Sequence, residues 1–577
     1  MNQTTNRSLL CLFTLSAMLA LPFLNPHHFN PVPTFFQEWT AALCGLLAAG
    51  TLLREEAVSS LELPEIGLLP LGLMAILSLQ FLTGKTQHPT QALLFALYPL
   101  WAILLLILAR NIRQRIPLET AVSVLAAAML CGALLSAAAE FLQFAGFGSR
   151  FGLISPLARG SGNLGQPNHQ ADYLWLGIVS ALFLRAENRL NNAGLFACLA
   201  ILITAASLTG SRSVLLYAFG LTALAFWAAR RFKTPALRSI ARTLILLIPA
   251  LFLLQWLLAH NEVVTTLNAP VAGERLFREA SGTSQRVQLW RTGFAIFTEH
   301  PWLGAGIGQF PFYSYLMTGA QSDGTYLGGG EHAHNLLIQL LCEFGILAPI
   351  LVIVLGIRWW LGFIRAPWTT AHWWIAAILL ILTTHSQLEY PLWYAFFLGI
   401  AALALGLGSP QAYALQLKSR RLIGLILAFA AATMASLFID YRQLEDTLNA
   451  RHRTTDGQPP SAQARLDALS RLHRESLFAH YVPLSYAFQL EVNREALADK
   501  IAVCQQAIRF SPVDLVTYKL AWLFALDGRT DEARLALKRA LATHPAYAPA
   551  ATEQLAVLIG PYPELSWLAA EIPAPPR

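Results

Sequence analysis

The chain has 577 residues, of which 55% are hydrophobic and only 13% are charged. Soluble domains carry about 25% charged residues, so this composition excludes an ordinary soluble protein and indicates a polytopic membrane protein. The formal net charge of +7 would suit a nucleic-acid-binding protein, but the placement of the basic residues excludes that class. The six cysteines include no CxxC pair, so the sequence encodes neither a disulfide framework nor a cysteine zinc site.

Thirteen apolar segments are predicted to cross the membrane as helices. The first lacks a small-x-small cleavage site and precedes many further spans, which indicates a retained span and not a signal peptide. The predicted spans are residues 8–24, 38–53, 66–83, 91–109, 118–139, 170–184, 193–208, 213–229, 240–259, 336–357, 371–388, 392–408 and 421–439.

The short loops alternate in charge along the chain. One set carries sixteen basic residues and the other carries four, namely Lys85, Arg150, Arg159 and Arg212. The positive-inside rule assigns the first set to the cytoplasm, which predicts a cytoplasmic N-terminus and, after thirteen spans, a C-terminal tail on the outer side. The basic excess is therefore a topology signal. The sixteen are Arg7, Arg54, Arg110, Arg113, Arg115, Arg185, Arg189, Arg230, Arg231, Lys233, Arg238, Arg358, Arg365, Lys418, Arg420 and Arg421.

This topology predicts four parts within an all-α polytopic membrane protein. Residues 1–259 hold nine spans and a polar loop at 140–168, and residues 260–335 form a large outer loop. Residues 336–439 hold the last four spans, and residues 440–577 form a soluble helical domain.

The soluble domain contains a short internal repeat. AIRFSP at 507–512 recurs as ALATHP at 540–545, a spacing of 33 residues, with two amphipathic helices around an Asp-Gly turn between them. This spacing is close to the tetratricopeptide period, and such repeats stack into protein-binding surfaces. The alternative is a plain helical bundle.

Arg212 ends the outer turn TGSR at 209–212. A charge at the membrane boundary costs several kcal/mol unless it has a partner. Two interpretations are open: the side chain reaches the lipid headgroups, or its guanidinium clamps a phosphate in a bidentate manner.

Two further arginines lie on a predicted amphipathic helix at 285–297. Arg286, near the helix start, is the preferred second phosphate clamp, and Arg291 is a candidate substrate contact. A helix lying on the membrane surface is the alternative. The GAGIGQF that follows at 304–310 lacks the strand of a dinucleotide-binding fingerprint, so its glycines are predicted to permit tight turns.

The stretch GGGEHAHN at 328–335 brings two histidines to the start of a predicted span. They are open to three interpretations: metal ligands with Glu331 and His169, although no metal-ligand spacing is present; structural caps of the helix; or a general base for a hydroxyl. His334 is the preferred base because it lies next to the span, and His332 is a candidate substrate contact. We expect no metal and no cofactor.

Polar and aromatic side chains also gather in two other outer segments, GQPNH at 165–169 and HSQLEYP at 385–391. Amides suit sugar hydroxyls or phosphate oxygens, although Asn168 is also a plausible helix N-cap and tyrosines at span ends are often interfacial anchors. The candidate substrate contacts here are Gln166, Asn168, His169, Glu389, Tyr390 and Tyr394.

Arginines, a histidine, amides and aromatics on one side of the membrane suit an amphiphilic donor. Such a donor has a polyprenyl tail in the bilayer, a pyrophosphate at the interface and a glycan in water. Arginine would neutralise the departing pyrophosphate, and the histidine would deprotonate an acceptor hydroxyl.

With these motifs, the chain resembles the O-antigen ligase and polymerase superfamily, and within it the pilin-type protein O-oligosaccharyltransferases. The superfamily features are TGSR at 209–212, Arg286–Trp290 with PWLGAGIGQF, and HAHN at 332–335. The subgroup features are GNLGQPNHQADYL at 162–174 and HSQLEYPLWYAFF at 385–397.

The resemblance implies metal-independent transfer of an oligosaccharide from undecaprenyl pyrophosphate in the periplasm to a pilin-like periplasmic protein. It implies a multi-pass protein of the bacterial inner membrane, with His334 as base and with Arg212 and Arg286 binding the pyrophosphate. Gln166 and Tyr390 match subgroup residues. The alternatives are a lipid A core ligase or a repeat-unit polymerase, and, in another class, a transporter of lipid-linked glycan.

Overall fold

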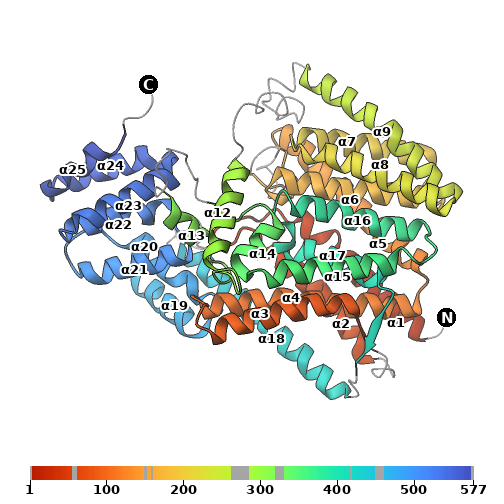
Figure 1. Cartoon of the computed structure of the whole chain (residues 1–577), viewed down its shortest axis with the longest axis horizontal. Helices are drawn as coiled ribbons and strands as arrows, with labels where there is room; N and C mark the ends of the chain where they lie inside the picture. Colours follow the sequence, from red (N-terminus) through yellow and green to blue (C-terminus); the bar gives the residue numbers. More distant parts are fainter. Residues whose placement is uncertain are drawn as a thin grey trace. The chain divides into compact units, whose positions relative to one another are not determined.

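The computed structural model describes residues 3–54, 61–147, 152–156, 160–260, 285–318, 330–415, 419–448 and 461–573 (Figure 1). The predicted outer loop at 260–335 therefore lies partly outside the described residues. The chain divides into two compact units. The first comprises Met1–Leu71, Tyr98–Gly282 and Val352–Ala435, and the second comprises Gly72–Leu97, Thr283–Leu351 and Ser436–Arg577.

The first unit is a bundle of apolar helices. Two three-residue strands, β1 (Glu62–Pro64) and β2 (Ala412–Ala414), pair antiparallel beside it. Its helices are α1 (Gln3–Met18), α2 (Phe35–Gly50), α5 (Leu118–Phe144), α6 (Pro167–Ala186), α7 (Asn192–Leu208), α8 (Ser213–Phe232), α9 (Pro235–Ala259), α16 (Thr370–Ser386) and α17 (Ala395–Gly408). Four more of the described helices have residues in both units: α3 (Leu68–Leu82), α4 (Pro89–Arg115), α15 (Leu347–Phe363) and α18 (Arg420–Leu448).

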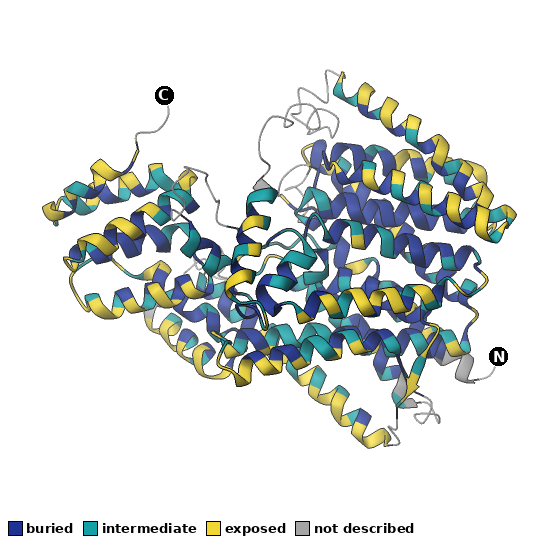
Figure 2. Ribbon diagram, in the orientation of Figure 1, coloured by how far each residue is buried: buried dark blue, intermediate teal, exposed yellow. Residues whose placement is uncertain are grey.

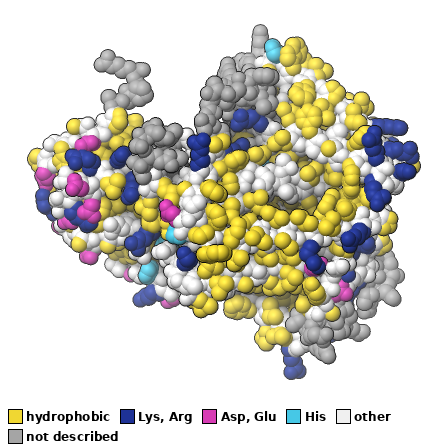
Figure 3. Space-filling view, in the orientation of Figure 1, with side chains coloured by type: hydrophobic (Ala, Val, Ile, Leu, Met, Phe, Trp, Pro, Cys, Tyr) yellow, Lys and Arg dark blue, Asp and Glu magenta, His cyan; other side chains and the backbone are white. Residues whose placement is uncertain are grey.

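Helix α6 is the centre of the first unit. Every side chain from His169 to Leu184 is buried, and the helix packs against α5, α7, α8 and α16 (Figure 2). By contrast, α9 and α18 expose apolar side chains such as Leu246 and Phe429, the latter 75% exposed. Broad hydrophobic areas also lie on the surface in Figure 3. Exposed apolar faces of this extent mark contact with lipid or another apolar partner.

Six described helical segments are long and apolar enough to cross a membrane, which supports the predicted all-α polytopic membrane protein. The number of spans stays a prediction. The six are Glu65–Leu82, Pro89–Arg115, Leu118–Phe144, Ser213–Phe232, Pro235–Ala259 and Arg420–Leu448; Ser8–Leu24, Asn192–Leu208, Leu347–Phe363 and Ala395–Gly408 are shorter apolar helical segments.

The single span predicted over 336–357 is wrong. The chain forms two helices there, α14 (Leu336–Phe344) and α15, separated at Gly345. Gly345 has φ +73°, a left-handed value that suits glycine, and a Cβ here would lie 2.2 Å from the Trp302 carbonyl oxygen. The next amide, that of Ile346, donates to Pro301 O at 2.9 Å. The glycine therefore ends the helix so that the chain can pair with the turn at 301–306.

The second unit joins residues 310–317 to the C-terminal helices around one core. Tyr315 on α13 is only 3% exposed and belongs to the core built by α21, α22 and α23, with Phe312 and Leu316 packed against it. The helices of this unit are α12 (Gln285–Glu299), α13 (Phe310–Met317), α14, α19 (Ala462–Glu475), α20 (Val482–Gln489), α21 (Leu497–Phe510), α22 (Asp514–Leu526), α23 (Thr530–Thr543), α24 (Ala548–Ile559) and α25 (Ser566–Glu571).

The predicted Asp-Gly turn is confirmed: α22 ends at Leu526, α23 begins at Thr530, and Gly528 has φ +76°. The two copies of the repeated segment also contact each other. The His544 Nε2 atom lies 2.6 Å from Pro512 O, and the Tyr518 hydroxyl donates to His544 O. The assignment to tetratricopeptide repeats stays a prediction.

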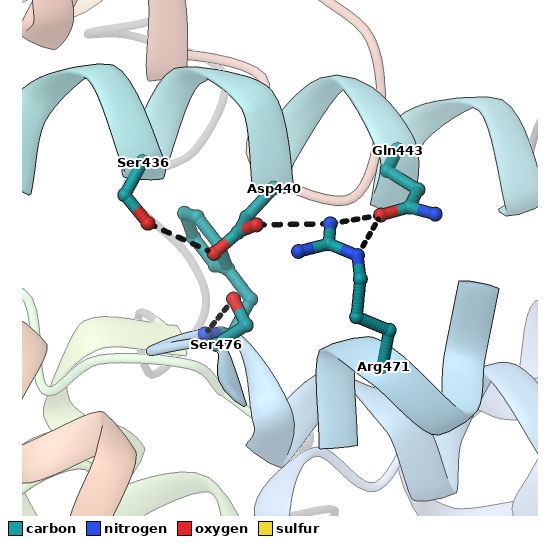
Figure 4. A network of polar contacts seen from close by, with 6 residues as sticks. Ser436, Asp440, Gln443, Arg471 and Ser476 are labelled. Atoms are coloured by element: carbon teal, nitrogen blue, oxygen red, sulfur yellow. Dashed lines mark hydrogen bonds and ion pairs between the residues drawn. The ribbon is translucent and has the colours of Figure 1, made fainter. Parts of the chain in front are cut away.

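The C-terminal part of α18 is fixed to α19 by a polar network (Figure 4). The Arg471 guanidinium on α19 donates to Asp440 Oδ1 at 3.0 Å and to Gln443 Oε1 at 2.9 Å, and Ser436 bonds the other Asp440 oxygen. Because Asp440 is 4% exposed, its charge needs these partners. The predicted boundary at 440 thus falls inside a continuous helix.

We expect the second unit to lose stability in mild acid. His480 is 5% exposed, and burial, followed by the charge of the nearby His88, lowers its pKa to about 3. An unfolded chain takes up this proton near pH 6.5, so the free energy of unfolding falls as the pH drops from about 6.5 towards 3, by about 2 kcal/mol at pH 5. Hydrogen exchange of α20 to α22 at pH 7 and pH 5, corrected for intrinsic rates, measures this loss. An equal loss in His480→Gln would contradict the assignment.

Candidate active site

The start of α6 is held by Gln166, not by Asn168 as the capping alternative supposed. Gln166 has extended backbone at the N-cap position, and its side-chain oxygen accepts from the His169 amide at 3.3 Å. Pro167 at the first helical position suits a helix start because it has no amide hydrogen to satisfy. The Asn168 side chain therefore does not cap the helix.

Asn168 instead binds the Glu389 carboxylate. Asn168 Nδ2 donates to Glu389 Oε1 at 2.8 Å, and Gln166 Nε2 lies 3.4 Å from Glu389 Oε2. The Glu389 side chain is 3% exposed, and its backbone amide donates to His385 O at 2.8 Å, just beyond the end of α16. Amide donors on both oxygens offset the cost of burying this carboxylate. The segments 162–174 and 385–397, far apart in sequence, therefore meet in space.

Aromatic rings enclose His169. Its ring centroid lies 5.0 Å from that of Tyr394, 6.1 Å from that of Tyr390 and 5.4 Å from that of His385. His169 is 3% exposed, whereas the two tyrosines are half-buried. The tyrosine rings are thus the more accessible surface of this group.

Asn163 fixes the loop that leads into α6. Its side chain bonds the Leu24 and Leu153 carbonyls and the Ser155 amide, and its own carbonyl accepts from Gln37. The side chain is nearly fully buried. Sequence reasoning did not single this residue out, although it lies inside the quoted motif GNLGQPNHQADYL.

Arg212 lies at the start of α8, with an exposed side chain. The preceding turn is closed by the Thr209 hydroxyl, which accepts from the Ser211 amide at 3.1 Å, and by Gly210 at φ +68°. Gly160 packs on this turn, since a Cβ there would lie 2.9 Å from the Leu208 carbonyl oxygen. The starts of α6 and α8 and the end of α16 therefore lie at one end of the first unit.

In the second unit, α12 carries Arg286 on its packed face. This face is formed by residues at helical spacing, namely Arg286, Leu289, Gly293 and Ile296. Leu289 and Ile296 are buried where α12 packs on α14. A Cβ at Gly293 would lie 2.5 Å from Ile338 Cγ2, so only glycine allows this approach. Arg286 is half-buried, whereas Arg291 is exposed.

The histidine loop runs along the first half of α12. Gly330 approaches Leu289, and Ala333 is fully buried and donates its amide to Gln339 Oε1 at 2.7 Å. This anchor holds the half-buried His332 and His334 on either side of Ala333. Asn335 caps α14 by accepting from the Leu337 and Ile338 amides, so the helix cap is Asn335.

His334 has φ +50°, a left-handed conformation that is uncommon outside glycine and asparagine. Such strained residues persist where the surrounding structure holds them, and they concentrate at functional sites. The anchored neighbours Ala333 and Asn335 supply that restraint.

The glycines of GAGIGQF make tight turns, as predicted. Gly304, Gly306 and Gly308 have φ of +70°, +107° and +71°. Gly304 approaches the backbone of Glu343, and the Glu343 carboxylate accepts from the Phe310 amide at 3.2 Å. Residues 304–310, which precede α14 in the chain, therefore pack against the C-terminal end of α14.

The predicted site residues fall into two groups, one in each unit. In the first unit, the contacts above join the segment 166–169 to the segment 389–394. The convergence of all the predicted residues on one substrate stays a prediction. The first unit holds Gln166, Asn168, His169, Arg212, Glu389, Tyr390 and Tyr394, and the second holds Arg286, Arg291, His332 and His334.

Sequence reasoning missed three buried polar residues behind the first group. Asp172, Tyr217 and His385 lie on α6, α8 and α16, and each is at most 1% exposed. A signal existed for Asp172, because an acid inside an apolar helix is expensive and is commonly functional. His385 was noted only as part of its motif, and nothing in the sequence pairs it with Tyr217.

Comparison with known proteins agrees with the motifs. A sequence profile described as "O-Antigen ligase" matches residues 197–353, "Protein glycosylation ligase" matches residues 162–184, and "Virulence factor membrane-bound polymerase, C-terminal" matches residues 373–556. A "General O-oligosaccharyltransferase" of Acinetobacter baylyi (strain ATCC 33305 / BD413 / ADP1) is 27% identical over 421 residues, which cover 70% of each chain. The chain is therefore a glycosyltransferase, an enzyme related to the O-antigen ligases and the protein glycosylation ligases.

Proposed function

We propose that this protein transfers an oligosaccharide en bloc from undecaprenyl pyrophosphate to Ser or Thr hydroxyls of periplasmic proteins such as pilin. The observation that carries the proposal is the contact of Asn168 and Gln166 with Glu389. Asn168 and Gln166 lie in the segment that matches protein glycosylation ligases. Glu389 lies in the second motif of that subgroup, so the two features that separate it from lipid A core ligases form one structural element.

Each residue group has a role in this reaction. The acceptor hydroxyl oxygen attacks the anomeric carbon of the first sugar, the bond from that carbon to the pyrophosphate oxygen breaks, and the hydroxyl proton passes to His334. Arg286 and Arg212 neutralise the departing pyrophosphate, a role that suits the guanidinium fork. Gln166, Asn168 and Glu389 orient sugar hydroxyls.

Further contacts come from His169, His332, Arg291, Tyr390 and Tyr394. No step in this scheme requires a metal ion. The scheme places the protein in the bacterial inner membrane, with a cytoplasmic N-terminus and with the loop and the helical domain in the periplasm. The helical domain would then be available to an acceptor protein.

A second candidate function uses the same chemistry on another acceptor. The matches to O-antigen ligases and to membrane-bound polymerases cover more of the chain than the glycosylation-ligase match. They favour transfer to lipid A core or to a growing glycan as the alternative.

An acceptor competition distinguishes the two candidates. The purified full-length protein is given lipid-linked glycan together with a pilin-like protein and lipid A core, and both products are measured by intact mass. We expect glycan on Ser or Thr of the protein. Glycan found only on lipid A core, or only as longer polymer, would overturn the protein acceptor and leave the transfer chemistry standing.

A further inference from the structure

One buried amide side chain on α14 reaches back to the histidine loop. Gln339 is 3% exposed, and its Oε1 atom accepts a hydrogen bond from the Ala333 amide at 2.7 Å. Ala333 is itself fully buried, in a hydrophobic cluster that includes Leu289 and Phe310. A buried backbone amide that loses its acceptor is costly, so the conformation of the loop at Ala333 depends on the Gln339 side chain.

Helix α14 is fixed at its other end, so it can serve as the support for this bond. Glu343 lies one turn after Gln339 on the same face of the helix, and its Oε1 atom accepts from the Phe310 amide at 3.2 Å. The Glu343 carbonyl accepts from Gln80 Nε2 at 2.6 Å, and the same Nε2 atom donates to Leu303 O at 2.7 Å. Gln80 is fully buried, in the part of α3 that belongs to the second unit. These contacts join the C-terminal end of α14 to α3 and to the turn at 301–306.

His334 lies between two fixed points of the loop. On one side, the Ala333 amide is bonded to Gln339. On the other side, the Asn335 side chain accepts from two amides in the first turn of α14. His334 itself has φ +50°, a value that a histidine keeps only where the surrounding structure holds it. The two anchors therefore set the direction in which the imidazole leaves the backbone.

We propose that Gln339 is a positioning residue for His334. By accepting the Ala333 amide, it keeps His334 in the left-handed conformation and directs the imidazole towards the acceptor hydroxyl. This direction matters because a base must lie within hydrogen-bond reach of its proton, and a displacement of about 1 Å can lower a rate about 10²-fold. The proposal rests on the proposed function in one respect, the role of His334 as base. The alternative is that Gln339 only fills space in the cluster.

Four substitutions separate the hydrogen bond from packing. Gln339→Met keeps the length of the side chain but lacks the amide oxygen, and Gln339→Glu keeps an oxygen at the same reach. Gln339→Asn is one methylene too short, so it should behave as Gln339→Met and covers the case in which that variant does not fold. Cys342→Ala is the packing control, because Cys342 is fully buried in the same cluster on the same helix and its substitution leaves the bond to Ala333 in place.

The full-length protein in lipid nanodiscs gives two readouts, hydrogen exchange of the Ala333 amide and the kinetics of transfer from lipid-linked glycan. In Gln339→Met we expect exchange at Ala333 about 10-fold faster and kcat about 10²-fold lower, with the KM for lipid-linked glycan unchanged. Gln339→Glu should restore slow exchange and part of the lost kcat. Cys342→Ala should lower the melting temperature but keep kcat and the exchange at Ala333.

Equal kcat in Gln339→Met and Cys342→Ala would overturn the proposal, as would unchanged exchange at Ala333 in Gln339→Met. Failure of the protein acceptor is a separate result, because the same kcat ratios can be measured with lipid A core as acceptor. Full activity of His334→Gly would remove the base from the proposed function. The exchange at Ala333 would then still decide whether Gln339 fixes the loop.

Discussion

His334→Ala should lower the rate of glycan transfer by about 10²- to 10⁴-fold, the range over which a general base accelerates proton transfer. The side chain lies beside the anchored Ala333 and one residue before the cap of α14. Loss of the imidazole removes the acceptor for the hydroxyl proton. Transfer to a peptide acceptor, measured with excess lipid-linked glycan, reports the effect on kcat.

Two controls separate the side chain from the backbone. Because position 334 is in the left-handed region at φ +50°, histidine and alanine both carry a conformational cost there of about 1–2 kcal/mol, which glycine avoids. His334→Gly should therefore fold as well as the wild type and be as inactive as His334→Ala. His332→Ala, two residues away, should retain more activity than either. Full activity in His334→Gly would rule out the base.

Arg286→Ala should lower transfer by about 10²- to 10³-fold, as expected on loss of one donor that stabilises transition-state charge. Arg286 lies on the packed stripe of α12 and is half-buried, so its charge is less screened than that of the exposed Arg291. Single-turnover transfer with saturating acceptor measures the effect, and donor titration shows whether KM or kcat changes.

Arg286→Lys distinguishes charge from geometry. Lysine keeps the charge but lacks the planar fork, so an intermediate rate is expected. Thr298→Ala, on an exposed position near the end of α12, is the control for the helix itself. Equal rates for Arg286→Ala and Thr298→Ala would remove Arg286 from the site.

The sequence was sufficient to predict elements set by local rules. Apolar length predicted membrane helices, and Asp527–Gly528 and the glycines of GAGIGQF predicted turns because left-handed backbone favours glycine. The motifs predicted which residues belong to the candidate site. None of these inferences requires knowledge of which segments meet in space.

Errors arose where tertiary contacts decide. By residue type Asn168 is the expected cap and Gln166 is not, but the structure has Gln166 at the cap and Asn168 bound to the Glu389 carboxylate. Gly345 lies in an otherwise helical apolar run, and its role depends on the turn at 301–306. Tyr217 and His385 are 168 residues apart, and no local sequence pattern predicts that they pair.

The shared core of the second unit affects how variants of the C-terminal tail must be interpreted. Tyr315 of α13 is buried among tail residues, and the Arg539 guanidinium lies 5.9 Å from its ring centroid. Removing the tail would expose α13, which shares its stretch of chain with α12 and Arg286. Inactivity of a truncated enzyme would therefore not distinguish disruption of α12 and α13 from loss of acceptor binding. For the same reason, a chimera that exchanges tails between related enzymes must carry the sequence of α13 with the tail it came from.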